Sequence, residues 1–305
     1  MEKYYYTVYG ENIECDFEIP ELVSIPPDSD ITIHICLEDI PPEILAGQNS
    51  IKDVLATPKL CCFEIESVGY YFIQEGKRIS IQCNKDFDPY KRKIFTLGSA
   101  LGIAMILKGR IPIHGGTVVQ NDKAVIITGD AGAGKSTIST ALRLDGMGFL
   151  ADDVSVLDKK SDNNWIVEPA YPQQKLCRDA AVSFGYELSD LIYIDEERDK
   201  FAVRFSEGFV NKGLPLKAFV ELNLGEDNQK EDLIISEILG TDKIKCMLKN
   251  TYRSFIFNMI GFAPALMKNY IEILNQTPIY KITRKPGVDT TKKIINMIRG
   301  LDELK

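Results

Sequence analysis

The stretch KAVIIT at residues 123–128, followed directly by GDAGAGKS at residues 129–136, decides the fold of this chain of 305 residues. KAVIIT is a short apolar run typical of a buried strand, and the residues from Lys135 to Leu144 are typical of a helix. Between them the pattern G-x-x-x-x-G-K-[ST] is complete, and it has the strand before it and the helix after it that a P-loop requires. The alternative is a glycine turn that matches by chance, and this context argues against it.

Each residue type in the loop has a physical role in holding a nucleoside triphosphate. Glycines let the backbone curl so that successive N–H groups point at phosphate oxygens, and the following helix presents its positive N-terminal end to the same charge. Lys135 is expected to reach the β- and γ-phosphates, and the Ser136 hydroxyl to bind Mg²⁺. We therefore predict a site for ATP and Mg²⁺ made by Gly129, Asp130, Ala131, Gly132, Ala133, Gly134, Lys135, Ser136 and Thr137.

Two carboxylates, Asp152 and Asp153, directly follow the next predicted strand, Phe149–Ala151. A carboxylate at this point can hold Mg²⁺ directly or through water, and an acid beside the γ-phosphate can take the proton from an attacking hydroxyl. A pair can divide these two tasks between its members. The alternative is a solvated acidic turn, because paired acids are common on protein surfaces.

A histidine precedes the P-loop, in the sequence IPIHGG at residues 111–116. The two glycines after His114 allow a close approach of the backbone to another group. A lone histidine is more often structural than functional, so the residue by itself leaves both roles open. The second histidine of the chain, His34, falls on the polar face of a predicted strand and is expected at the surface.

The remaining pattern predicts an α/β chain with a P-loop domain and a small β-rich N-terminal domain. Residues 1–88 mostly follow a period of two, with a hairpin signal around residues 74–77, and residues 89–109 indicate a linking helix. Residues 110–305 mix strands and helices, as in an α/β or α+β domain. Helices are expected at 241–260, 264–275 and 289–304, and strands at 111–119, 123–128, 149–151, 218–224 and 278–283.

Composition limits the class of protein and of partner. The net charge of -8 argues against broad binding of nucleic acid or of an anionic membrane, because both would be repelled. The first residues lack the apolar segment of a secretory signal, and the longest nearly apolar run, 97–107, is about half of the ~20 residues that cross a bilayer. Seven cysteines without a C-x-x-C pair and only two histidines supply a zinc site poorly. A reducing cytoplasm is the simplest location.

Taken together, His114-Gly-Gly, the loop GDAGAGKST and Leu150-Ala151-Asp152-Asp153 resemble the HPr kinase/phosphorylase family of P-loop kinases. The order H-G, G-D-x-G-x-G-K-S, D-D at this spacing is specific to that family among P-loop proteins, and the resemblance covers residues 111–158 well. The outer segments look like a divergent branch, the serine kinases found beside lasso-peptide biosynthesis genes. These looser matches are residues 4–22, 198–205, 215–222, 250–253 and 278–287.

The resemblance implies an HPr-kinase-like fold and an ATP-dependent kinase acting on a serine hydroxyl. Asp152 would then be the general base, Asp153 would support it or bind Mg²⁺, and His114 would lie near the transferred phosphate. Lys135 would complete this set at the phosphates. An arginine that stabilises the charge of the transition state would come from one of the basic residues outside the loop. The candidates are Arg253 and Arg284, with Arg178 and Lys200 as further ones, and for each a plain surface cation is the alternative.

Two departures from the family pattern concern its partner protein and its reverse reaction. Thr137 stands where HPr kinases usually carry a glutamate that helps with the metal, and the family's C-terminal glycine-containing signature has no match. The sequence therefore leaves open both the recognition of HPr and phosphorolysis. Hexamers are usual for HPr kinases, and the sequence leaves a homo-oligomer open here as well.

Three functions remain after the motifs are weighed. The first is a kinase whose acceptor is a peptide or protein serine, such as the C-terminal serine of a precursor peptide, or a small compound such as free serine. The second is a nucleotide switch or ATPase without an acceptor. Against it, N-K-x-D is absent, because residues 211–214 read NKGL, and so is L-S-G-G-Q. The third is a binding module that kept the fold, against which the intact lysine, serine and acids argue.

Overall fold

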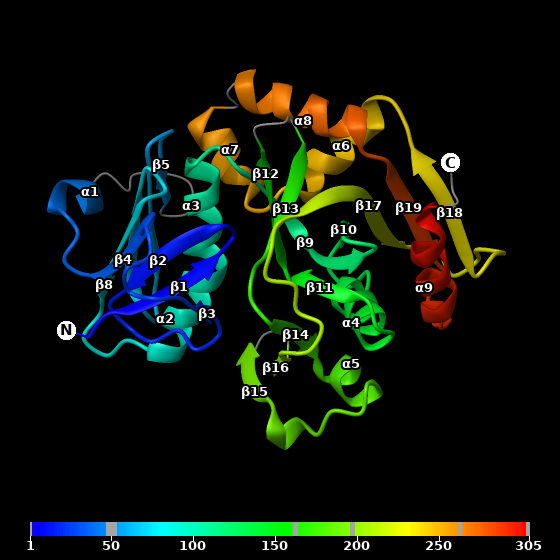
Figure 1. The fold of residues 1–305 in the computed structure, drawn as a ribbon, viewed down its shortest axis with the longest axis horizontal. Coiled ribbons are helices and arrows are strands. Elements are labelled where there is room, and N and C mark those ends of the chain that lie inside the picture. Colours follow the sequence, from blue (N-terminus) through cyan, green and yellow to red (C-terminus); the bar gives the residue numbers. More distant parts are fainter. Residues whose placement is uncertain (1, 47–53, 161–163, 196–198, 262–263, 303–305) are drawn as a thin grey trace. The chain divides into compact units, whose positions relative to one another are not determined.

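The computed structural model describes residues 2–46, 54–160, 164–195, 199–261 and 264–302 (Figure 1). The chain divides into two compact units. The first consists of Met1–Pro112 with Tyr252–Met267, and the second of Ile113–Thr251 with Lys268–Lys305. The inclusion of residues 252–267 in the first unit has no sign in the sequence pattern, because this segment is far from the N-terminal strands along the chain.

A mixed eight-stranded sheet forms the centre of the first unit. Its strands are β1 (Tyr4–Val8), β2 (Glu11–Cys15), β3 (Val23–Ser24), β4 (Ile33–Leu37), β5 (Val54–Ala56), β6 (Leu60–Ile65), β7 (Gly69–Gln74) and β8 (Arg78–Cys83). They are arranged in the order β3-β1-β2-β4-β8-β7-β6-β5. The predicted hairpin is β7–β8, with Gln74 opposite Arg78. Alternate residues of β4 and β8, such as Ile33, Ile35 and Ile79, are fully buried, which is why these segments show a period of two.

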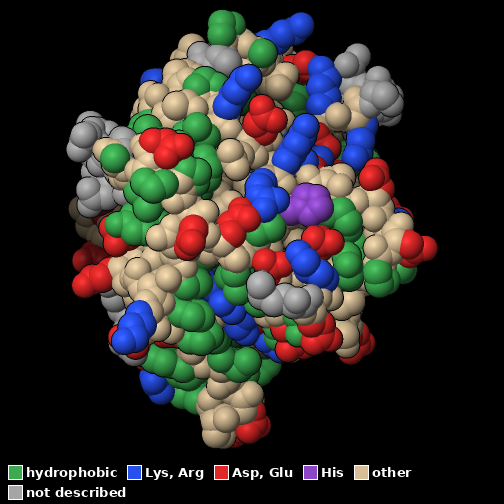
Figure 2. Space-filling model, turned by 90° about the vertical axis from the view of Figure 1, so that its left-hand side faces the viewer, with side chains coloured by type: hydrophobic (Ala, Val, Ile, Leu, Met, Phe, Trp, Pro, Cys, Tyr) green, Lys and Arg blue, Asp and Glu red, His purple; other side chains and the backbone are tan. Residues whose placement is uncertain are grey.

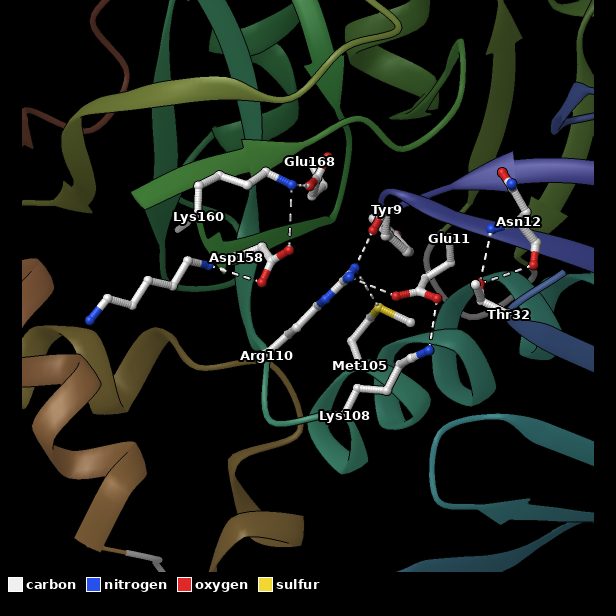
Figure 3. A network of polar contacts seen from close by, with 11 residues as sticks. Tyr9, Glu11, Asn12, Thr32, Met105, Lys108, Arg110, Asp158, Lys160 and Glu168 are labelled. Carbon is white, nitrogen blue, oxygen red and sulfur yellow. Dashed lines mark hydrogen bonds and ion pairs between the residues drawn. The ribbon is translucent and has the colours of Figure 1, made fainter. Parts of the chain in front are cut away.

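The helices of the first unit are α1 (Pro42–Ala46), α2 (Pro89–Phe95), the π-helical η1 (Thr96–Ala100), α3 (Leu101–Leu107) and α7 (Ser254–Ile260). Asp88 caps α2, since its carboxylate accepts from the backbone N–H groups of Tyr90 and Lys91 at 2.8 and 3.2 Å. The segments α2, η1 and α3 follow one another directly, within the first unit. At the end of α3, Glu11 of β2 is almost buried and pairs with Lys108 at 2.7 Å and Arg110 at 2.6 Å (Figure 3).

The second unit contains the sheet that carries the P-loop. Its strands are β9 (Ile111–Gln120), β10 (Lys123–Gly129), β11 (Gly148–Ala151), β12 (Val154–Lys159), β13 (Trp165–Glu168), β17 (Leu214–Leu224), β18 (Leu233–Ile238) and β19 (Ile279–Arg284). The order is β10-β9-β12-β13-β17-β19-β18, with β11 paired to β9 and a further pairing of β10 with β17. The strand before the P-loop thus lies between antiparallel β9 and parallel β17.

Helices cover both faces of this sheet. On one face α4 (Lys135–Leu144) and α9 (Thr291–Arg299) pack against the strands, with Ile138 and Ile294 among the fully buried side chains (Figure 1). On the other face Cys246 and Met247 of α6 (Thr241–Asn250) lie beside Phe219 of β17. Two further helices are α8 (Pro264–Gln276) and η3 (Gly300–Asp302). A separate three-stranded sheet has the order β14 (Gln173–Cys177), β16 (Lys200–Arg204), β15 (Ile192–Asp195). The helices α5 (Arg178–Ser183) and η2 (Leu188–Asp190) lie between β14 and β15 in the sequence. The described part of the chain is therefore a mixed α/β structure with several sheets.

The prediction of one helix over residues 241–260 is wrong. The structure has two helices, α6 and α7, separated by Thr251, Tyr252 and Arg253. Thr251 is extended, with a φ of -67° and a ψ of 128°, and Arg253 is left-handed, with a φ of 51°. The Tyr252 N–H donates to the carbonyl of Pro112 at 2.9 Å instead of continuing the helix. No glycine or proline marks this break, so local sequence could not reveal it.

The surface and the cysteines are those of an ordinary globular chain. Figure 2 shows Lys and Arg side chains interspersed with Asp and Glu over one face. Among the described helices, none has both the length and the apolar character needed to cross a membrane. All seven cysteines are free thiols, and five of them are buried; Cys83 is half-buried and Cys177 is exposed.

Candidate functional site

The three motifs of the second unit meet on neighbouring strands. In the antiparallel register of β9 and β10, Gly115 lies opposite Thr128 and Gly116 opposite Ile127, so the H-G-G motif borders the start of the P-loop. The Thr128 hydroxyl donates to the carbonyl of His114 at 2.8 Å. On the other side of β9, β11 pairs Ala151 with Thr117 and delivers the two acids to the same end. His114, the P-loop and the two acids, which are separated in the sequence, are thus brought together at one end of three adjacent strands.

The glycines of the H-G-G motif are explained by packing. A Cβ on Gly115 would press against the carbonyl oxygen of Ile127 in β10, and one on Gly116 would lie 3.4 Å from the Ser139 hydroxyl of α4. The close approach expected from the sequence is therefore one between strand and strand and between strand and helix. It brings the backbone beside His114 tightly against the P-loop strand.

Asp153 lies among positive groups. Its backbone is left-handed, with a φ of 62°, and its carbonyl accepts from the Gly115 N–H at 3.0 Å. Its carboxylate lies 3.6 Å from Nδ1 of His114 and 3.4 Å from Nζ of Lys175. Burial by itself raises the pKa of Asp153, but the charges of Lys175, His114 and Lys200 outweigh this and lower the pKa to about 2. Asp153 is thus a firm anion at neutral pH.

Asp152 has the opposite environment. It is only 8% exposed, and burial together with the neighbouring charge of Asp153 raises its pKa to about 6. Its Oδ2 accepts from the backbone N–H of Lys175 at 2.8 Å, which holds the carboxylate in one orientation. Two adjacent carboxyl groups with pKa values pushed apart are an arrangement suited to acid–base chemistry.

The P-loop backbone is bonded by its own lysine, Lys135, and by Arg284 of β19. The Lys135 ammonium bonds to the carbonyls of Gly129 and Asp130 at 2.8 and 3.1 Å. Arg284, at the end of β19, donates to the carbonyl of Ala133 at 3.1 Å, and burial lowers the pKa of its guanidinium. Arg284 was a candidate from the sequence, and the structure places it against the second half of the loop.

A second cation reaches the loop from α6. The Lys249 ammonium lies 3.0 Å from a carboxylate oxygen of Asp130 and 3.6 Å from Oε1 of Glu221. Glu221 lies on β17 opposite Thr128, is 5% exposed, and accepts from the Asn250 side chain at 3.1 Å. The buried acid therefore fixes the end of α6 beside the P-loop. Nothing in the sequence pattern marked Glu221 or Lys249.

The donor set fits a magnesium ion that arrives with a triphosphate. Within the described residues, no group of three or more His, Cys, Asp or Glu side chains is arranged to hold a metal by itself. Mg²⁺ usually binds one or two carboxylates, substrate phosphates and water, so a cage is not required. Ser136 is the second residue of α4, and the Asp153 side chain, ionised at neutral pH, is partly exposed. A hydroxyl and a carboxylate of this kind are ligands that Mg²⁺ accepts.

Some of the candidates make their contacts with residues outside this cluster. Arg253 belongs to the first unit and donates to the Ser99 hydroxyl at 2.5 Å, so its role at the phosphates stays a prediction. Arg178 pairs with Asp199 in an exposed ion pair, and His34 lies 3.4 Å from Glu14 at the surface. Lys175, which contacts both acids of the pair, was missed. It is a single lysine in the short strand β14, and no motif around it marks it as a site residue.

Comparison with known proteins gives a likeness among the solved structures. No protein-family profile matches the chain, and no curated protein matches it. Among solved structures, the chain is similar to the Hpr(Ser) kinase/phosphatase from Coxiella burnetii. The match covers 63% of this chain and 97% of that one, with 16% identity and a TM-score of 0.34. At these values the likeness assigns neither fold nor function, and the argument for function rests on the site.

Proposed function

We propose that the protein is an ATP-dependent kinase that transfers the γ-phosphate to a serine hydroxyl of a peptide or protein. The observation that supports it best is the register of β10, β9 and β11, which joins the P-loop, His114 and the acid pair along one edge. A P-loop binds the triphosphate, and a nearly buried carboxylate with a raised pKa beside it is suited to accept a proton.

In the proposed reaction, Asp152 accepts the proton of the serine hydroxyl as the serine oxygen attacks the γ-phosphorus. The new O–P bond forms while the bond from phosphorus to the β–γ bridging oxygen breaks, and ADP leaves with that electron pair. The Lys175 N–H occupies Oδ2 of Asp152, so Oδ1 is the oxygen we assign to the proton. Lys135 and His114 supply positive or donor groups toward the phosphates. Mg²⁺, held by Ser136 and Asp153, would neutralise charge on the triphosphate when bound.

The finer features of the proposal come from the sequence resemblance. The acceptor that it favours is the C-terminal serine of a precursor peptide. The enzyme would work in the cytoplasm, with neither nucleic acid nor membrane as partner, and it could assemble as a homo-oligomer.

The test is phosphate transfer from γ-labelled ATP with Mg²⁺ to HPr, to serine-ended peptides and to free serine. Asp152→Asn should bind ATP with unchanged affinity and transfer no label. Asp122→Asn is the matched control, because Asp122 lies in the exposed turn between β9 and β10, where it has a φ of 55° that asparagine tolerates. Label that appears only as free phosphate, or equal transfer by Asp152→Asn and wild type, would contradict the proposal.

A further inference from the structure

The first unit contains a cavity of about 220 Å³, and none of the P-loop residues lines it. Phe63, Ile103 and Ile256 supply apolar walls, and the polar groups that reach it are Glu64, Ser99 and Arg253. Apolar walls with a few polar groups are the usual composition of a ligand pocket.

Arg253 is held in this cavity at a conformational cost. Its φ of 51° is in the left-handed region, which a long side chain adopts only when its surroundings require it, and such strain gathers at ligand sites. Its Nη2 donates a hydrogen bond to the Ser99 hydroxyl, at 2.5 Å. Over the described residues, no carboxylate comes within ion-pair distance of its guanidinium. Among the described residues, the other four N–H donors of this partly buried cation thus have no acceptor.

Two features of the surrounding helix keep Arg253 in this position. Tyr252 packs so closely on Gly102 of α3 that a Cβ there would lie 2.7 Å from the tyrosine ring. The π-helical turn η1 contains Ser99, the hydroxyl that receives the arginine. Single π turns inside helices are frequent at functional sites. The break between α6 and α7 at residues 251–253 thus coincides with the residue that lines the cavity, Arg253.

We propose that this cavity binds a carboxylate carried on an apolar group. A planar guanidinium matches a carboxylate with two parallel hydrogen bonds, and the apolar walls would cover the attached group. Glu64 on the rim disfavours a dianion such as a phosphate, because the two negative charges repel. This inference goes beyond the proposed kinase, and it assigns Arg253 to ligand binding in the first unit instead of the transition state.

The test measures the binding of three probes to the full chain by calorimetry, in the absence of nucleotide. The probes are the peptide Leu-Leu-Ser with a free C-terminus, the same peptide amidated, and isovalerate as a small acid. The free peptide should bind, and amidation should weaken binding about ten- to a hundredfold, as expected for loss of a charged hydrogen bond. If isovalerate binds as tightly as the free peptide, the result would support the carboxylate site and identify small acids as its ligands.

Variants separate this site from the rest of the chain. Arg253→Asn removes the guanidinium and suits the left-handed backbone, and Ile65→Trp fills the cavity from the end of β6; both should abolish peptide binding. Lys91→Gln, an exposed lysine of α2 in the same unit, removes one charge and should change nothing. Equal binding of the amidated peptide, or undiminished binding by both cavity variants, would overturn the inference.

Kinetics distinguish failure of this site from failure of the kinase. Peptide binding that depends on Arg253, without phosphate transfer to any acceptor, would reject the kinase and keep the site. Conversely, transfer whose kcat falls in Arg253→Asn while the KM for the peptide is unchanged would return Arg253 to the transition state and reject the inference.

Discussion

Asp152 and Asp153 are adjacent in the chain, yet they lie in opposite electrostatic surroundings. Burial and the charge of its neighbour raise the pKa of Asp152 to about 6. Positive groups lower the pKa of Asp153 to about 2 despite its partial burial. The sequence predicted the pair and its place after a strand, because an apolar run followed by two acids is a local pattern. It could not predict which acid is the base, since that depends on Lys175, 22 residues further on.

The first prediction concerns the pH dependence of the proposed transfer. A general base must be ionised, so kcat/KM should fall as the pH drops through about 6, where Asp152 takes up a proton. Lys175→Met removes a positive charge that lowers this pKa, so the acidic limb should move to higher pH. The measurement is kcat/KM for the acceptor between pH 5 and 9 in both proteins. An acidic limb that stays in place in Lys175→Met would reject Asp152 as the titrating group.

The second prediction concerns stability. Folding raises the pKa of Asp152, so the ionised carboxylate destabilises the folded state at pH values above about 6. This cost disappears as the pH falls toward the ordinary pKa of an aspartate. Asp153 has a lowered pKa and contributes stability above its ordinary value, lost only toward pH 2. Asp152→Asn should therefore have a Tm at least equal to that of the wild type at pH 8, with a smaller difference at pH 5. A much lower Tm at pH 8 would contradict this assignment.

At the scale of elements, β9 is the strand on which the site depends. It pairs with β10 on one side and β11 on the other, and Gly115 is the point of closest approach to β10. The strand and the helix after the P-loop were predicted from sequence because their apolar runs and glycine signals are local. The pairing of β17 with β10, which places Glu221 opposite Thr128, was not predicted, because parallel pairing of distant strands leaves no local pattern in the sequence.

The third prediction follows from this packing. A methyl group at Gly115 would meet the carbonyl of Ile127, and backbone cannot move aside as a side chain can. Gly115→Ala should lower the free energy of unfolding by about 1–3 kcal/mol, as overpacking does. Gly300→Ala is the control, because open space surrounds that position. Urea denaturation of both variants measures the difference, and equal values would show that β9 and β10 can separate without cost.

The fourth prediction concerns α6. Lys249 neutralises Asp130 of the loop and buried Glu221, so its loss leaves two negative charges near the phosphates. Lys249→Gln should raise the Kd for ATP several-fold, with a smaller effect at high salt. Lys245→Gln on the same helix is the control, since Lys245 forms only an exposed pair with Asp242. Equal affinities for the two variants would mean that α6 has no electrostatic part in the site.

At the scale of the molecule, the P-loop and the acids lie in the second unit, and the cavity with Arg253 in the first. The sequence could predict strands near the N-terminus and a mixed P-loop region. It could not assign residues 252–267 to the first unit, because tertiary packing around Tyr252, and no local signal, ends α6 and begins α7.

The fifth prediction is that nucleotide binding protects the second unit most. A ligand at about a hundred times its Kd stabilises the folded state by about 2.7 kcal/mol. Hydrogen exchange with ATP and Mg²⁺ should slow first in β10, α4 and β9, and Lys135→Ala should abolish the effect. Slower exchange confined to the first unit would place the nucleotide elsewhere.

The distribution of the thiols has a practical consequence. Burial raises the pKa of Cys15, Cys61 and Cys246 to about 12, so these thiols resist alkylation, whereas Cys177 is exposed. Cys177 ends β14, two residues beyond the lysine that contacts both site acids. A fluorescent maleimide added to the unmodified chain should therefore attach first at Cys177. The native sequence thus offers an attachment point for a fluorescent dye, two positions along the chain from the lysine that contacts both site acids.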